Sequence, residues 1–129
     1  MWLMLMLCTG VYGHAQKTVY SVHSADDEIV LEIWRDKGNV MLSVKVSDSL
    51  ALDYLTIERR PDFQESFTQC KYITNEDLKA AGGHILKKDV YAYPGSGSVM
   101  YRIKVSQNGG TRTYPAVVLP ALGKDGSTP

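Results

Sequence analysis

Residues 99–119, VMYRIKVSQNGGTRTYPAVVL, decide the fold of this chain. In the first half, four apolar residues alternate with Met, Arg, Lys and Ser, the pattern of a strand with one buried face: Val99, Tyr101, Ile103 and Val105. Asn108-Gly109 follows, a pair that tolerates the positive φ angles of a tight hairpin turn. Thr111–Leu119 then returns as an edge strand, because a sheet accommodates the proline in it best at its edge. The apolar face of this hairpin requires a second sheet to cover it.

Other segments supply that sheet. Short strands are predicted at residues 28–35, 40–47, 54–60, 67–73 and 85–91, with turn residues between them. About seven short strands and almost no helix predict an all-β fold, a single antiparallel two-sheet β-sandwich.

One segment, Thr74–Gly82, has the signals of a short helix. Thr74 is a suitable N-cap, and Asp77 stands at the capping-box position three residues later. Gly82 suits the left-handed position that ends many helices. We therefore expect a helix of one or two turns.

The first fifteen residues, MWLMLMLCTGVYGHA, resemble a secretory signal peptide. Trp2–Cys8 is the apolar segment, and Gly13 and Ala15 are small residues at the −3 and −1 positions of a cleavage site before Gln16. The basic residues that usually begin such a peptide are missing here. The pattern predicts an exported protein, whether periplasmic, at the cell surface or extracellular.

Two alternatives for this segment fit less well. A buried first strand would alternate, which the segment does not. A lipoprotein signal at Cys8 would not carry the bulky Leu7 before the cysteine. Cleavage after Ala15 leaves Cys70 as the single cysteine, so the mature domain has no internal disulfide to stabilise it.

The remaining chain is expected to form one domain. The 129 residues divide into the signal peptide at 1–15, a polar lead-in at 16–27, the sandwich at 28–121 and a polar tail at 122–129. Fourteen basic and fourteen acidic residues cancel and are interspersed, which disfavours a nucleic-acid partner. Contact with a membrane is expected only through the export signal.

The segment Tyr101–Gly110, YRIKVSQNGG, resembles strand F and the following turn of fibronectin type III domains, in which Tyr-x-hydrophobic-x-Val precedes Asn and Gly. The resemblance implies that Tyr101 is a corner tyrosine whose hydroxyl bonds to nearby backbone. It also gives Asn108 and Gly109 a structural role in the turn.

Asn39–Arg60, NVMLSVKVSDSLALDYLTIERR, is similar to fibronectin type III-like modules of secreted bacterial proteins that carry type IX sorting domains. Asp89, Gly95 and Tyr101-Arg102 match later elements of those modules. Val44 stands where such modules usually carry a tryptophan, which implies a differently packed core.

Groups for catalysis or metal binding do not converge in the sequence. His23 and His84 are expected on loops without further ligands at metal-binding spacing, and Cys70 on a strand fits a packed thiol better than a nucleophile. We therefore expect neither enzymatic activity nor a bound metal or cofactor.

Several side chains are candidates for a ligand or partner surface. Tyr91, Tyr93 and Tyr114 would offer rigid contact area with a polar edge if they are exposed, although packing in the core is the simpler interpretation. Arg59 and Arg60 at a strand end form a pair that can bind a carboxylate, or remain solvated.

Two further features bear on the role of the domain. Asp48-Ser49-Leu50 matches the short motif at which exported proteins of such bacteria are O-glycosylated, which makes Ser49 a candidate acceptor. The edge strand Thr111–Leu119 offers a site for strand addition by a partner.

The sequence thus favours an exported, non-catalytic module for binding, adhesion or assembly that contacts a protein partner in the cell envelope. The alternative is a carbohydrate-binding accessory protein that uses exposed tyrosines. A β-sandwich supports either role, so the fold does not decide between them.

Overall fold

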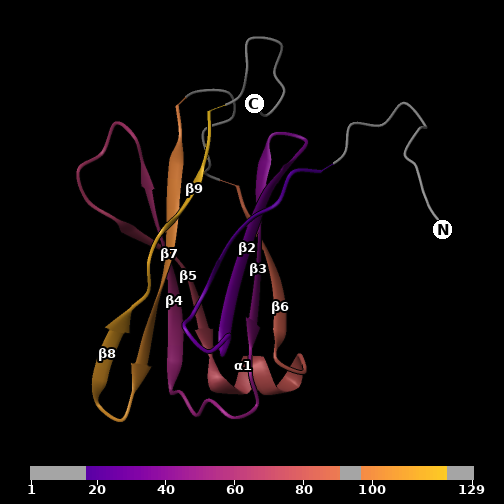
Figure 1. The fold of residues 1–129 in the computed structure, drawn as a ribbon, viewed down its shortest axis with the longest axis vertical. Coiled ribbons are helices and arrows are strands. Elements are labelled where there is room, and N and C mark those ends of the chain that lie inside the picture. The colour runs from indigo at the N-terminus through magenta and orange to yellow at the C-terminus, as the bar shows by residue number, and fades with distance from the viewer. Residues whose placement is uncertain (1–16, 91–96, 122–129) are drawn as a thin grey trace, which may run out of the picture.

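The computed structural model describes residues 17–90 and 97–121, and within them the chain forms nine strands and one short helix (Figure 1). In chain order the elements are β1 (Tyr20–His23), β2 (Ile29–Asp36), β3 (Asn39–Val46), β4 (Tyr54–Pro61), β5 (Thr68–Thr74), α1 (Asn75–Ala80), β6 (His84–Asp89), β7 (Val99–Gln107), β8 (Gly110–Thr113) and β9 (Val117–Leu119). No helix within these residues has the length and apolar character needed to span a membrane.

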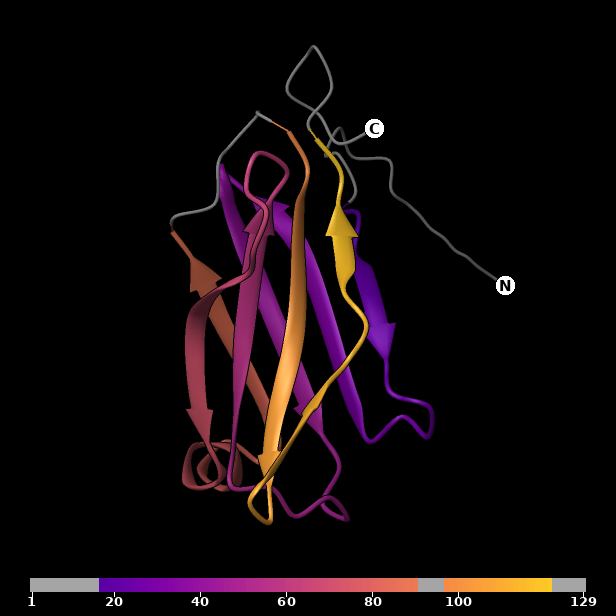
Figure 2. The same cartoon turned by 90° about the vertical axis from the view of Figure 1, so that its left-hand side faces the viewer.

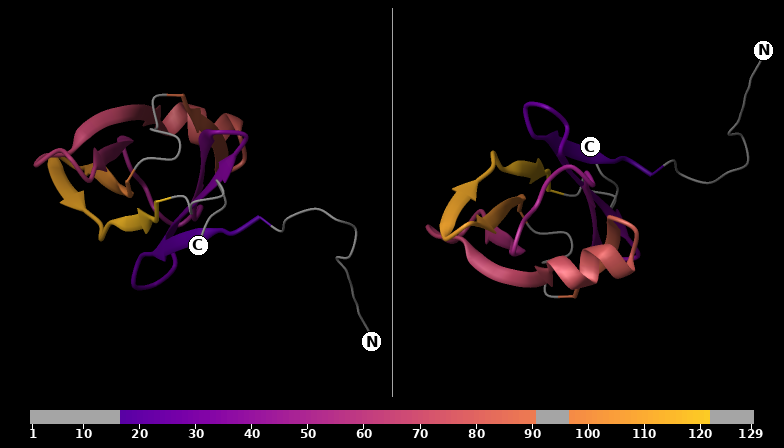
Figure 3. Two further views of the ribbon diagram at one scale, coloured as in Figure 1. Left: turned by 90° about the horizontal axis from the view of Figure 1, so that it is seen from above. Right: turned by 90° about the horizontal axis from the view of Figure 1, so that it is seen from below.

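The strands form two antiparallel sheets that pack face to face, which confirms the predicted all-β sandwich (Figures 1 and 2). One sheet has the order β1-β2-β3-β6, and the other has the order β5-β4-β7-β8 with β9 also paired to β7. Seen along the long axis, the two sheets enclose one core (Figure 3).

Strand alternation places the predicted apolar residues in that core. The fully buried side chains at its centre come from both sheets: Leu31, Ile33, Val40, Leu42, Val44, Leu55, Ile57, Ile73, Tyr101, Ile103, Val105 and Leu119. Because successive side chains of a strand point to opposite faces, the polar residues between them lie on the outer faces.

The polar lead-in is the first correction to the sequence-based expectation. Residues 20–23 form β1, which pairs with β2 at the edge of its sheet. Tyr20 and Val22 pack against the core while Ser21 and His23 are exposed. Buried and exposed side chains alternate over only these four residues, which is too short a pattern to predict a strand from the sequence. The strand is defined instead by its hydrogen bonds to β2.

The predicted return strand Thr111–Leu119 is divided in two. β8 pairs with β7 through Lys104↔Thr113, whereas β9 pairs through Tyr101↔Val117, so the return chain carries one extra residue between these pairs. Pro115 lies in this interval and has no amide proton to donate to the ladder.

The predicted turn and caps are confirmed. Asn108 and Gly109 have φ angles of 51° and 78°, as a tight hairpin requires. Thr74 Oγ1 accepts a hydrogen bond from Asp77 N at 3.0 Å, and Asp77 Oδ2 accepts one from Thr74 N at 3.1 Å. Gly82 has a φ of 69°, so α1 ends in the left-handed conformation.

A buried ion pair joins the two sheets near one end of the core. Asp89, at the end of β6, is 1% exposed. Arg59 Nη1 on β4 donates to its two carboxylate oxygens at 2.5 and 2.6 Å. Tyr101 on β7 donates its hydroxyl to Asp89 Oδ2 at 2.7 Å. Arg59 and Tyr101 are direct cross-strand neighbours, so two adjacent strands of one sheet hold a single residue of the other.

This arrangement corrects two predictions. The single hydroxyl proton of Tyr101 goes to a carboxylate, not to nearby backbone as the family resemblance implies. The Arg59 side chain is only 14% exposed and turns inward, so Arg59 and Arg60 do not form a surface pair. Asp89 supplies a buried anion that Arg59 neutralises, which is the physical reason for both changes.

Removing Asp89 should therefore destabilise the fold strongly. We expect Asp89→Ala to lower the free energy of unfolding by about 3–5 kcal/mol, because it leaves the Arg59 charge uncompensated. Tyr101→Phe should cost about 1–3 kcal/mol, since it removes one hydrogen bond. Urea unfolding at neutral pH measures both changes in the free energy of unfolding.

Asp26→Ala, at an exposed position, is the control and should change stability by less than about 0.5 kcal/mol. An Asp89→Ala effect as small as that of the control would contradict this account.

Candidate functional site

The outer face of the β5-β4-β7-β8 sheet carries a group of aromatic and charged side chains. This sheet lies in front in Figure 2. We call its outward residues the tyrosine face: Tyr54, Thr56, Glu58, Tyr72, Arg102 and Lys104. Those on β4 and β7 alternate with the buried residues of the core and therefore belong to the outer face of the sheet. Neighbouring side chains cover Thr56, which is 5% exposed, and most of the Glu58 side chain, which is 12% exposed.

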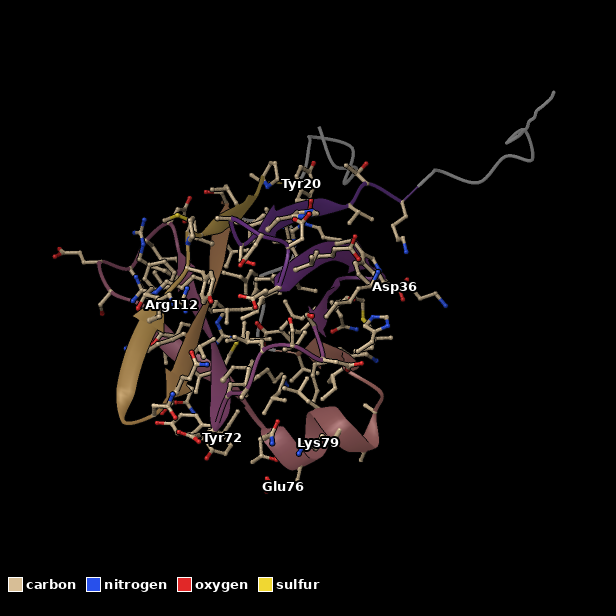
Figure 4. The ribbon with its side chains drawn as sticks, turned by 60° about the horizontal axis from the view of Figure 1, so that its bottom comes forward. Tyr20, Asp36, Tyr72, Glu76, Lys79 and Arg112 are labelled. Atoms are coloured by element: carbon tan, nitrogen blue, oxygen red, sulfur yellow. The ribbon has the colours of Figure 1, made fainter. Side chains whose placement is uncertain are left out.

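Two tyrosines form the apolar end of this face. The rings of Tyr54 and Tyr72 lie with their centroids 5.0 Å apart and their planes inclined at 33°. Tyr54 is 36% exposed and Tyr72 is 52% exposed. Tyr72 lies on the part of β5 next to α1, which carries Glu76 and Lys79 (Figure 4). The pair is held by two adjacent paired strands and therefore offers a rigid aromatic surface.

The opposite end of the face carries arginines against a phenylalanine. The Arg102 guanidinium lies 3.8 Å from the centroid of the Phe67 ring, and that of Arg60 lies 5.7 Å from it. Arg60 Nη1 also donates to the Gln64 carbonyl at 2.7 Å, which ties the strand to the loop that follows it. Arg60 thus remains on the outside, as predicted, without Arg59 beside it.

A polar hollow of about 250 Å³ runs along β4 from the tyrosine pair. It is lined by Tyr54, Thr56, Glu58, Gln69, Lys104, Ser106 and Thr111. Glu58 accepts a hydrogen bond from Arg102 Nε at 2.7 Å and lies 3.6 Å from Lys104 Nζ. The hollow therefore combines one aromatic wall with hydroxyl, amide and charged groups.

The predicted tyrosines are not the ones that the structure brings together. Tyr91 and Tyr93 lie outside the described residues. Tyr114 packs against the core with Arg112 5.4 Å from its ring centroid, so it does not lie on an open face. Tyr54 and Tyr72 were not predicted, although the inward assignment of Leu55 implied that Tyr54 points outward. Their proximity depends on the β4–β5 register, which local pattern does not give.

Ser49, the candidate glycan acceptor, is exposed in the loop after β3. Its hydroxyl lies 2.9 Å from the hydroxyl of Ser47, and its amide also donates to Ser47 Oγ at 3.2 Å. The loop thus presents Ser49 where an enzyme can reach it.

The histidines lie away from the tyrosine face. His23 Nδ1 contacts Asp27 Oδ1 at 2.9 Å on the surface, and His84 Nε2 lies 2.7 Å from Ser43 Oγ. A Ser–His contact also occurs in hydrolases, but among the described residues no carboxylate hydrogen-bonds to His84 to complete such a site. In that same part of the chain, no group of three or more His, Cys, Asp or Glu is arranged to hold a metal ion.

Cys70 is a packed thiol, as predicted. It is the extra residue of β5 where the register with β4 shifts between Ile57 and Glu58, and its side chain packs against the core. Burial, followed by the negative charge of Asp89, raises the pKa of the Cys70 thiol to about 12. Because the thiolate is the nucleophile, the raised pKa disfavours nucleophilic reaction of Cys70 at neutral pH.

No protein-family model, curated protein or solved structure matches this chain.

The raised pKa of Cys70 predicts slow alkylation. At pH 8 the thiolate fraction should be roughly 10³-fold lower than for a thiol with a pKa of 9.0, because the pKa rises to about 12. We expect iodoacetamide to modify folded Gln16–Pro129 at least about 100-fold more slowly than the same chain in urea, as read by mass spectrometry. Cys70→Ser controls for reaction at other side chains. Equal rates in the folded and unfolded chains would refute the burial of this thiol.

Proposed function

We propose that this protein is an exported, non-catalytic binding module that contacts a protein partner through the tyrosine face. The observation that carries the proposal is the exposed Tyr54–Tyr72 pair on a sheet whose strands are fixed by hydrogen bonding. Tyrosine and arginine are enriched among the residues that dominate binding energy at protein interfaces.

The composition of the face supports this role. Aromatic rings stand at both ends, at Tyr54–Tyr72 and at Phe67, and Arg102 stacks on the second of them. Two side-chain torsions fix a tyrosine, so its binding area is gained at low entropic cost. A partner therefore meets a surface that needs little ordering on association.

The resemblance to fibronectin type III domains is part of this proposal. Its support is the two-sheet architecture, with Tyr101 buried in β7 and a hairpin turn at Asn108-Gly109 that leads into β8. This chain differs from the expected corner tyrosine in one respect. The Tyr101 hydroxyl donates its hydrogen bond to the Asp89 carboxylate, not to a backbone carbonyl.

A second candidate function, carbohydrate binding, is favoured by the hollow beside the tyrosines. Sugar rings stack on aromatic side chains, and their hydroxyls require hydrogen-bonding partners such as Glu58, Gln69 and Lys104. In this second candidate function, Tyr54 and Tyr72 take the role that the sequence suggested for Tyr91 and Tyr93.

The export part of the proposal rests on the N-terminal sequence pattern alone. We expect the protein isolated from its native cells to begin at Gln16, because Gly13 and Ala15 suit the cleaving peptidase. N-terminal sequencing together with intact mass measures this. A chain that retains Met1 in a cytoplasmic fraction would reject export.

The binding face is tested by truncating both tyrosines. We expect Tyr54→Ala/Tyr72→Ala to weaken the affinity for the captured partner by roughly 30-fold or more, the effect of losing about 2 kcal/mol at an interface centre. Partners are captured from the native cell envelope with Gln16–Pro129 as bait and are identified by mass spectrometry. Affinities are then measured by titration calorimetry.

Leu86→Ala is the matched control for this test. Leu86 is 56% exposed on the outer face of the other sheet, so its truncation removes an exposed apolar side chain away from the tyrosine face. A protein lost only by the tyrosine variant supports the proposal. A polysaccharide lost in the same way supports the second candidate. A partner retained equally by all three chains would place the binding surface elsewhere.

A further inference from the structure

The loop after β3 and the end of α1 lie at the base of the sandwich (Figure 1). A second hollow, of about 190 Å³, is lined by residues of β3, this loop, α1 and the residues after α1. We call it the base pocket. It is lined by Val46, Ser47, Asp48, Leu50, Asn75, Leu78, Lys79, Gly82 and Gly83. Pockets that hold drug-sized molecules usually have volumes of about 300–1,000 Å³, so this one suits a smaller ligand.

The floor of the base pocket is apolar and belongs to the core. Leu78 is buried, and Val46 and Leu50 pack against the core cluster. These side chains leave room for an aliphatic group of a ligand above them. Burial of such a group is the main favourable term that this floor can provide.

The two walls are fixed to each other by backbone hydrogen bonds. Val46 N donates to the Gly83 carbonyl at 2.8 Å, and Gly83 N donates to the Leu78 carbonyl at 2.8 Å. A Cβ on Gly83 would lie 2.8 Å from the Val46 carbonyl oxygen, so only glycine allows this approach. The pocket is therefore part of the folded structure rather than a gap between independent loops.

The rim carries one charge of each sign. Asp48 stands on the loop after β3 and Lys79 on α1, where Figure 4 labels it. Both side chains are exposed, and among the described residues neither forms an ion pair or side-chain hydrogen bond. Asn75 and Ser47 add neutral polar groups to the same rim. A ligand that carries both a positive and a negative charge would complement Asp48 and Lys79. A ligand with a single charge would leave one of these two side chains without a partner of opposite charge.

We propose that the base pocket binds a free aliphatic α-amino acid. Its ammonium group faces Asp48, its carboxylate faces Lys79, and its side chain lies on Val46, Leu50 and Leu78. The opposite charges of the rim, the apolar floor and the small volume all match this class of ligand. This site is separate from the tyrosine face and does not depend on the function proposed for it.

L-leucine is the probe for this site. We expect saturable shifts of the backbone amides of residues 46–50 and 75–83 in nuclear magnetic resonance spectra of Gln16–Pro129, with a Kd on the order of 1 mM. N-acetyl-L-leucine lacks the ammonium charge and L-leucinamide lacks the carboxylate. Each should bind about 5–10-fold more weakly than L-leucine.

Two variants assign the charges. Asp48→Asn should abolish the preference for L-leucine over N-acetyl-L-leucine, and Lys79→Gln should abolish the preference over L-leucinamide. Both positions are exposed, and glutamine retains good helix propensity, so the fold should persist, as the same spectra report. Asp26→Asn and Lys87→Gln, exposed charges outside the pocket, should retain both preferences.

Several outcomes would overturn the proposal. The first is the absence of saturable shifts with L-leucine at these residues. The second is equal binding of the three compounds, which would mean that the rim charges are not used. The third is an unchanged preference in Asp48→Asn and Lys79→Gln, which would place the ligand elsewhere.

Discussion

The carboxylate of Asp89, held between Arg59 and Tyr101 inside the sandwich, is the constraint on which the rest of the structure depends. A charge removed from water must be neutralised and hydrogen-bonded where it lies. Arg59 and Tyr101 are direct neighbours on β4 and β7, so only one placement of the end of β6 satisfies all three groups. Hydrophobic burial stabilises the packing of the two sheets, but it is not directional. The hydrogen bonds of Asp89 to Arg59 and Tyr101 are directional, so they fix which residues of the two sheets face each other.

Because the Arg59 side chain points into the core, it also determines which residues of β4 lie on the outer face of the sheet. With Arg59 facing the core, Glu58 and Arg60 lie on the outer face of the sheet, because neighbours on a strand alternate. Glu58 then meets Arg102 and Lys104 of β7, and Tyr54 meets Tyr72 of β5. The internal ion pair and the outer binding surface are thus two faces of the same strand.

The hollow on the tyrosine face and the base pocket differ in the ligand chemistry they suit. The one on the tyrosine face is open and polar with an aromatic wall, which suits a partner surface or a sugar ring. The base pocket has an apolar floor and one charge of each sign among its lining residues, which suits a small zwitterion. Rigid strands support the first, whereas Gly83, which follows α1, shapes the second through its hydrogen bond to Val46 of β3.

The sequence by itself determined the sandwich class, most strands, the Asn108-Gly109 turn and the caps of α1, because each follows from residues close together in the chain. The sequence did not predict β1 or the contact between the Tyr54 and Tyr72 rings. It also did not predict that the Arg59 side chain points into the core or that Asp89 accepts the hydrogen bond of the Tyr101 hydroxyl. Arg59 and Asp89 are 30 residues apart, and their contact requires two sheets in a defined position. Local periodicity gives the face of a side chain, but only tertiary packing decides which distant side chain it meets.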